Sequence, residues 1–264
     1  MMAMRDRLLF AAQLAFTLLV AAFLIVPALL SMLAGVTANY FRGISSGLTL
    51  DWVLQVWELY ADTIFRSFEI AFATLACTLA IGVPAAYGLY VRGDRLARLI
   101  EEIITLPLAI PGLAIALALL LTYGGFGDFR RSWSFILVGH VVFTLPFMVR
   151  SVMAVLGQID VRTLDESAAS LGASPWRRFR DVIVPNAAPG ILAGSLMVVT
   201  LSLGEFNLTW MLHTLPVGLA DSYASMRLEV ASAYTLVFFV MIIPLLVAMQ
   251  LIGRRNGRPG TARA

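Results

Sequence analysis

Long apolar stretches alternate with short polar segments along the whole chain. Six of these stretches have about 20 residues or more, the length that an α-helix needs to cross a hydrocarbon core roughly 30 Å thick. Several contain proline or glycine, which membrane helices tolerate where neighbouring helices satisfy the freed backbone groups. The pattern predicts an all-α polytopic membrane protein whose residues 1–264 form a single transmembrane domain, with helices at about 8–34, 64–91, 99–122, 133–156, 186–211 and 231–253.

Composition supports this class of protein. Hydrophobic residues make up 60% of the chain, charged residues make up 13%, and the mean hydropathy is +0.87. A soluble domain of this length could not remove so much apolar surface from water. The first apolar stretch follows a charged start, as in a signal peptide, but it is longer than the apolar part of such peptides, so we expect it to be retained as a helix.

The 19 basic side chains are all arginine, and they are distributed unequally between the two sides of the predicted membrane. Fourteen lie on the side that holds both termini, and the other five are Arg42, Arg66, Arg130, Arg131 and Arg227. Because cytoplasmic segments are enriched in basic residues, we expect both termini and residues 157–185 in the cytoplasm. The arginines are scattered over loops and form no stripe, which argues against a nucleic-acid partner.

The sequence contains no lysine, which excludes one kind of nucleotide site. A P-loop requires G-x-x-x-x-G-K-[ST], so if ATP powers this protein, ATP and Mg²⁺ are bound by another subunit, and no cofactor is expected in this chain. Neither His140 nor His213 suggests a metal ligand, so no metal site is expected. These features argue against an enzyme.

Residues 157–185, here called the polar insert, separate the fourth and fifth apolar stretches. Thr163 and Glu166 match a capping box, and Gly172 is typical of a helix end. Ser174 and Pro175 are typical of the start of a second helix. The apolar sides of the two short helices would be Leu164, Ala168 and Leu171 in the first, and Trp176, Phe179 and Val182–Val184 in the second. These residues leave two roles open, a helix pair resting on lipid headgroups or a docking site for a protein.

The polar insert resembles the EAA loop of permeases from binding-protein-dependent ABC importers, whose pattern is E-A-A-x3-G-x9-I-x-L-P. Four positions match at the family spacing: Glu166, Ala168, Gly172 and Pro185. Three positions depart from it by small or apolar exchanges: Ser167, Val182 and Val184. Residues 105–120, 140–160 and 202–212 resemble the third, fourth and fifth spans of that family.

The resemblance implies a MetI-like transmembrane domain of a type I importer in the bacterial inner membrane. It implies partners: a dimer of ABC ATPase subunits, a second permease that is identical or paralogous, a periplasmic or extracellular solute-binding protein, and membrane lipid. The second helix of the polar insert would be a coupling helix seated on the ATPase, with Glu166 and Gly172 fixing the angle between the two helices. The coupling role is expected for Glu166, Ala168, Gly172, Ser174, Pro175, Trp176, Arg177, Phe179 and Pro185.

A substrate path is expected near the outer end of the fifth stretch, at Glu205, Asn207 and Thr209. Glu205 is either a pore-facing carboxylate or a residue that packs helices near the interface, because an acid inside a membrane requires water or a partner. Residues 214–219 resemble permeases for polyamines, aminoethylphosphonate and iron, and residues 204–206 resemble permeases for molybdate, sulfate and thiamine. A polyamine is the first expectation. An ion-coupled secondary carrier that uses Glu205 is the alternative of a different class, although it would not need the polar insert.

Overall fold

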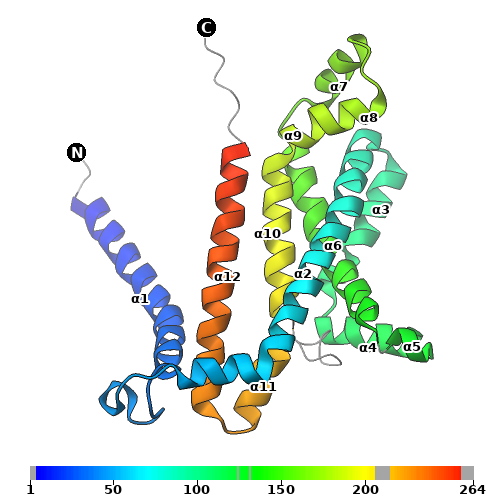
Figure 1. Ribbon diagram of the computed structural model, residues 1–264. Coiled ribbons are helices and arrows are strands. Elements are labelled where there is room, and N and C mark those ends of the chain that lie inside the picture. Colours follow the sequence, from blue (N-terminus) through cyan, green and yellow to red (C-terminus); the bar gives the residue numbers. More distant parts are fainter. Residues whose placement is uncertain (1–3, 124, 131, 206–214, 257–264) are drawn as a thin grey trace. The chain divides into compact units, whose positions relative to one another are not determined.

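Figure 1 shows the computed structural model of the chain, which describes residues 4–123, 125–130, 132–205 and 215–256. Within these ranges the regular elements are helices, apart from a single β-bridge between Thr37 and Leu48. The all-α expectation is therefore confirmed.

Four of the described helices are long and apolar enough to cross a membrane individually. They are α1 (Met4–Ala34), α2 (Asp51–Arg92), α6 (Trp133–Leu156) and α12 (Leu228–Asn256). Two bent pairs of helices raise the number of candidate spans to six. The second pair includes α10 (Ala188–Gly204), which covers most of the predicted fifth helix; residues 206–211 of that helix lie outside the described residues.

The predicted helix at 99–122 is broken in the middle. It consists of α3 (Arg95–Thr105), the short 3₁₀ helix η2 (Leu106–Ala109) and α4 (Gly112–Tyr123), with a bend of 107° between the two halves. Ile110 has extended backbone angles, φ −101° and ψ 128°, because the ring of the following Pro111 disfavours the helical conformation. The apolar composition alone did not reveal this break.

Helix α2 starts at Asp51, so the expectation that it would start near residue 64 is wrong. Its first turns are amphipathic: Val56 is fully buried, and Tyr60, one turn later, is almost fully buried. Acidic residues on the opposite side of these turns lower the hydropathy of the segment. A pattern of period 3.6 was therefore present in residues 51–63 but was hidden by their average polarity.

The chain folds as two compact units, and the first contains residues 1–61 and 219–241. The Trp52 indole N–H donates to the Thr37 carbonyl at 3.0 Å, which attaches the segment after α1 to the start of α2. The ring of Tyr60 stacks on that of Tyr234 at 4.9 Å, which joins α2 to α12. Aromatic side chains thus organise this unit.

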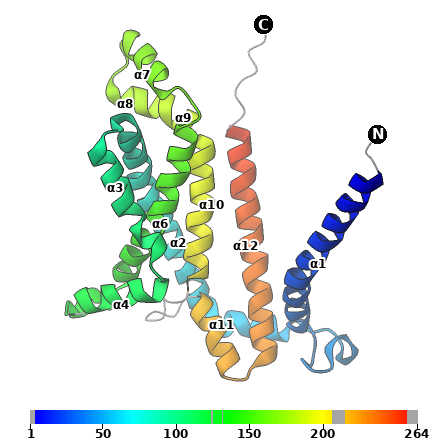
Figure 2. The same cartoon turned by 180° about the vertical axis from the view of Figure 1, so that it is seen from behind.

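The second unit contains residues 62–218 and 242–264, and its most extensively packed helix pair is α6 with α10. A Cβ atom at Gly190 would lie 2.5 Å from the Ser151 carbonyl oxygen, and one at Gly194 would lie 3.1 Å from the Met148 Cα. Glycines thus let the two helix backbones approach closely, as is common between membrane helices. In Figures 1 and 2 the polar insert lies beyond the ends of these two helices.

Candidate functional site

The first helix of the polar insert, α7 (Val161–Ser170), is capped by Asp160. The Asp160 carboxylate accepts hydrogen bonds from the Thr163 backbone N–H at 3.1 Å and from the Thr163 hydroxyl at 2.6 Å. The hydroxyl hydrogen bond holds the pKa of Asp160 below its usual value, because it stabilises the ionised carboxyl. The start of the helix is therefore fixed by a charged cap.

The predicted capping box of Thr163 and Glu166 is wrong. Thr163 is the third residue inside α7, not the residue before it, and its hydroxyl donates back to Asp160. Glu166 instead forms an ion pair with Arg162, one turn earlier in the same helix, at 2.7 Å. Both side chains of this pair are exposed, and the pair lies within the first helix.

Gly172 ends the first helix as the sequence predicts. Its φ is +79°, in the left-handed region that favours glycine. The Ala173 N–H donates to the Ala168 carbonyl at 3.0 Å, and the Gly172 N–H donates to the Ala169 carbonyl at 2.9 Å. This pair of hydrogen bonds is a Schellman motif, which satisfies the last carbonyls of α7 while the chain reverses direction.

Ser174 starts the second helix, again as predicted. Its hydroxyl accepts a hydrogen bond from the Arg177 N–H at 3.5 Å, and Pro175 occupies the first helical position. The helix does not stop after one turn: α8 (Pro175–Arg177) passes into the π-helix η3 (Arg178–Ile183) and then into α9 (Val184–Asn186). Pro185, the last residue of the EAA pattern, lies in α9, before a bend of 73° into α10.

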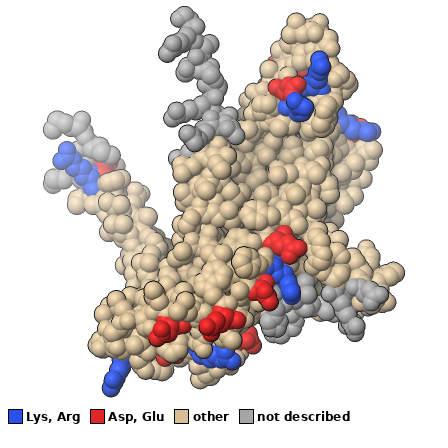
Figure 3. All heavy atoms as spheres, in the orientation of Figure 1, with Lys and Arg blue, Asp and Glu red and all other residues tan. Residues whose placement is uncertain are grey.

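The polar insert has an inner face that is buried in the core and an outer face that is exposed. Val161 and Ile183, and Ala187 just after the polar insert, are buried in one hydrophobic cluster with residues of α2 and α6. Leu171 is 88% exposed and Trp176 is 65% exposed. Leu171 therefore does not continue the apolar stripe predicted for the first helix. In Figure 3 acidic and basic side chains gather on the polar insert, and the helical surface directly below it shows no charge.

The expected coupling residues divide between these faces. Trp176 and Arg177 are exposed at the start of the second helix, together with Ser174 and Pro175. Phe179 is half-buried and its ring lies 5.7 Å from that of Trp176. Ala168 is half-buried on α7, and Glu166 is exposed there. The second helix thus presents one aromatic side chain outward and supports it with another.

Asp165, which the sequence reasoning did not single out, contacts both the second helix and α2. One carboxylate oxygen accepts from Arg178 Nη1 at 2.5 Å, and the other accepts from the Tyr87 hydroxyl at 3.2 Å. The Tyr87 ring also lies 5.5 Å from the ring of Phe179. Local helix signals could not find this cluster, because its members are brought together only when the chain turns back at Gly172 and packs on α2.

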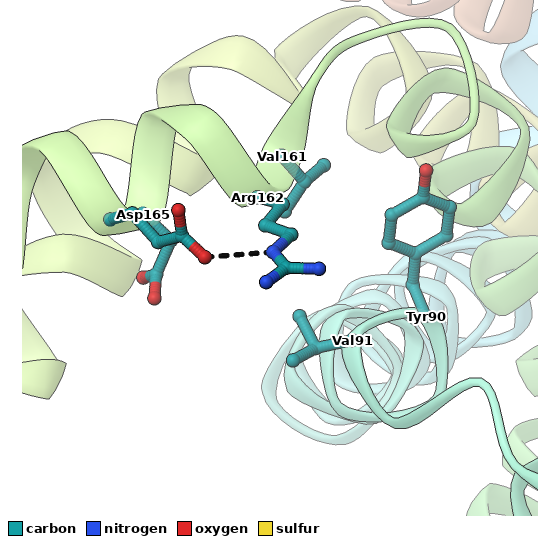
Figure 4. Close-up of a pocket in the computed structure, with 6 residues that line it drawn as sticks. Tyr90, Val91, Val161, Arg162 and Asp165 are labelled. Carbon is teal, nitrogen blue, oxygen red and sulfur yellow. Dashed lines mark hydrogen bonds and ion pairs between the residues drawn. The ribbon is translucent and has the colours of Figure 1, made fainter.

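A cavity of about 460 Å³ lies where the end of α2 meets α7. Its lining is Tyr90, Val91, Val161, Arg162, Asp165 and Glu166, drawn in Figure 4, where the dashed line marks the ion pair between Arg162 and Glu166. The charged lining comes from α7 alone, whereas α2 contributes an aromatic and an aliphatic side chain. The cavity thus belongs to the junction between the polar insert and the helix bundle.

The expected substrate path is described only at its first residue. Glu205 directly follows α10, with extended backbone angles of φ −78° and ψ 115°, and it is half-buried. Asn207 and Thr209 lie outside the described residues. Whether Glu205 lines a pore or packs helices therefore stays a prediction.

Comparisons with known proteins agree with this architecture. A family model described as "Binding-protein-dependent transport system inner membrane component" matches residues 78–258. The chain is 26% identical over 243 residues to the protein named as putative 2-aminoethylphosphonate transport system permease protein PhnV of Salmonella typhimurium strain LT2, covering 89% of this chain and 91% of that protein. It is 28% identical over 214 residues to the molybdenum transport system permease protein ModB of Azotobacter vinelandii, covering 74% of this chain and 93% of that protein.

A solved structure shares the fold. The inward-facing MetNI methionine ABC transporter matches with a TM-score of 0.61 and 19% identity, covering 77% of this chain and 97% of the matched chain. At this identity the match supports the MetI-like fold, and the family model supports the class of function. The chain belongs to the family of binding-protein-dependent transport system inner membrane components and is a permease subunit of an ABC importer.

Proposed function

We propose that this permease is driven by a separate ATPase subunit that docks on the outer face of the polar insert. The observation that carries the proposal is the exposed Trp176, on helices that also expose Leu171 and Arg177 and whose inner face is buried in the core. Exposed aromatic side chains beside arginine are typical of protein interfaces. The lipid-resting alternative is less well supported, because the apolar residues Val161 and Ile183 of the polar insert already face the core.

In this proposal the predicted coupling residues have separate tasks. Trp176 and Arg177 contact the ATPase, Ser174 and Pro175 start the helix that presents them, and Phe179 supports Trp176 from behind. Gly172 sets the turn between the helices, while Glu166, Ala168 and Pro185 shape the elements on either side. Family membership favours this arrangement over an ion-coupled secondary carrier, because importers of this family are driven by an ATPase.

The complete importer would contain two ATPase subunits, which bind ATP and Mg²⁺, a second permease and a solute-binding protein. It would lie in the bacterial inner membrane with both termini and the polar insert in the cytoplasm. The arginine distribution supports this orientation, since 14 of 19 arginines fall on that side.

The proposed substrate is a small anion that carries a phosphonate or a similar tetrahedral oxyanion group. The two curated relatives described above are named for 2-aminoethylphosphonate and for molybdenum, and neither is named for a polyamine. The expectation of a polyamine therefore has no support from these relatives. The likeness to PhnV extends over most of both chains, which makes a phosphonate the first candidate.

Replacing Trp176 with alanine tests the docking proposal. Because truncating a central interface tryptophan costs about 2 kcal/mol or more, we expect roughly thirtyfold weaker retention of the ATPase subunit during purification. Phe41→Ala is the matched control, since Phe41 is also an exposed aromatic residue but lies outside the polar insert. Equal retention of the ATPase by both variants would contradict the docking role of Trp176.

Uptake in cells that lack their own permease for these solutes, complemented with this chain and its partner subunits, tests the substrate. Labelled 2-aminoethylphosphonate, molybdate and spermidine would be compared at equal expression. We expect uptake of the phosphonate that stops with vanadate, which blocks the ATPase. Uptake of spermidine alone would overturn the anion proposal and would support an acidic path at Glu205, to be checked with Glu205→Gln.

A further inference from the structure

Asp165 connects three elements through one carboxylate. It belongs to α7, and its two oxygens accept from Arg178 of η3 and from Tyr87 of α2. Through these two contacts the first helix of the polar insert is joined both to the second helix and to α2. We call Tyr87, Asp165 and Arg178 the α2 junction.

The α2 junction contains the least exposed ion pair among the described residues. The side chains of Asp165 and Arg178 are 24% and 22% exposed, whereas the other described pairs, Arg92 with Asp94, Arg162 with Glu166 and Arg180 with Asp181, are exposed. Water screens the attraction of an exposed pair and leaves it weak. A pair removed from most of the water attracts more strongly, and losing one partner leaves the other uncompensated.

Aromatic packing extends the α2 junction to the outer face of the polar insert. The ring of Phe179 lies 5.5 Å from that of Tyr87 on one side and 5.7 Å from that of Trp176 on the other. Tyr87 therefore contacts the first helix through its hydroxyl and the second helix through its ring. A continuous series of contacts runs from the exposed Trp176 to α2.

The polar insert and α2 are not held together by closeness in the sequence. The polar insert is joined in sequence to α6 and α10, and α2 ends at Arg92, far from it in the chain. Among the described residues, movement of the insert relative to α2 is restrained by packing and by the polar contacts of Asp165. The side chain that the EAA pattern emphasises, Glu166, pairs within its own helix and provides no such restraint.

We propose that Asp165 is a positioning residue that makes the polar insert and α2 move as one body, so that movement of the docked ATPase reaches the bundle through α2. The proposal deepens the docking function proposed above and rests on it. Asp165 does not contact the ATPase in this scheme. Its loss leaves the ATPase bound and hydrolysing ATP, while less of that hydrolysis drives transport.

The test uses the complete importer reconstituted in liposomes with its ATPase and binding protein. Three measurements are made for each variant: retention of the ATPase subunit, the rate of ATP hydrolysis, and substrate molecules transported per ATP. Asp165→Asn removes the charge that attracts Arg178, and Tyr87→Phe removes only the hydroxyl while keeping the ring. We expect transport per ATP to fall at least about fivefold for Asp165→Asn, and by less for Tyr87→Phe, with ATPase retention unchanged.

Two further variants separate positioning from general damage. Arg92→Gln removes an exposed ion pair on the same unit, and we expect transport per ATP to stay at the wild-type value. Exchanging the two charges, with Asp165→Arg and Arg178→Asp together, restores the attraction, and we expect transport per ATP above that of either single change. If Asp165 had a purely structural role, its loss would lower abundance and thermal stability, and the charge exchange would not restore the number of substrate molecules transported per ATP.

Several results would overturn the proposal. Unchanged transport per ATP in Asp165→Asn would show that the α2 junction transmits nothing. Loss of the ATPase subunit in that variant, equal to the loss in Trp176→Ala, would make Asp165 a docking residue. Failure of the docking proposal is recognised separately, because Trp176→Ala would then retain the ATPase, whereas the Asp165 variants are judged only in complexes that contain it.

Discussion

At the scale of single residues, Gly172 is required because its backbone adopts a positive φ, and not because a side chain at this position would collide with a neighbour. Its φ of +79° lies where L-residues with a side chain are disfavoured, yet beyond its two chain neighbours no atom of the described residues lies within 4 Å of the position that a Cβ would occupy. The Schellman hydrogen bonds around it fix the reversal between the two helices of the polar insert. A residue that tolerates the left-handed region should therefore replace it better than one of similar size that does not.

We expect Gly172→Val to abolish most transport and Gly172→Asn to retain a substantial part of it. A left-handed conformation costs roughly 1–2 kcal/mol for most L-residues, more for β-branched ones, and asparagine is the usual exception. Transport would be compared at equal membrane abundance. Equal transport by the two variants, at any level, would show that the positive φ is not the reason why position 172 requires glycine.

Asp160 gives the polar insert a dependence on pH. Its folded pKa is lowered by the Thr163 hydrogen bonds, so its contribution to stability is complete above the unfolded value of about 3.9 and is lost as the pH falls through the folded value. We expect hydrogen-exchange protection of the Thr163 amide to drop below about pH 4. Asp160→Asn keeps an oxygen acceptor that does not titrate, and its protection should stay constant over this range.

At the scale of elements, the helix signals of the polar insert were predictable where they are local. Gly172 and Ser174 act within a few residues of themselves, and both behave as their types suggest. Asp160 and Thr163 are both residue types that cap helices, and sequence alone does not distinguish them; the structure assigns the cap to Asp160. The contact between Asp165 and Arg178 was not predictable, because it depends on how two helices return toward each other and onto α2. The break before Pro111 was hidden by uniform apolar composition.

The pairing of α6 with α10 yields a test with a matched control. Gly190→Ala places a methyl group against the Ser151 carbonyl, and we expect it to destabilise the protein by about 1–3 kcal/mol through overpacking. Gly88, also in a helix, has open space around it, so Gly88→Ala should be neutral or stabilise by about 0.5–1 kcal/mol. Thermal unfolding in detergent measures both. Equal midpoints for the two variants would argue against backbone contact at Gly190.

At the scale of the whole molecule, the orientation in the membrane can be tested with single cysteines. Cys77→Ser removes the native thiol, after which Ala38→Cys and Ala169→Cys each place a new one at an exposed position. In intact spheroplasts we expect a membrane-impermeant maleimide to label position 38 and to reach position 169 only after lysis. The reverse pattern would place the polar insert outside the cell and would remove the basis for ATPase docking.

The close approach of α6 and α10 also has a consequence for biosynthesis. Both helices and the polar insert between them occupy one continuous segment, from Trp133 to Gly204, and their glycine-mediated contact needs no residue from later in the chain. A hairpin of this kind can form as soon as its second helix enters the membrane, while α12 is still being translated. Because local contacts form before distant ones, this hairpin is expected to be the earliest stable part of the protein and the template on which α2 and α12 later pack.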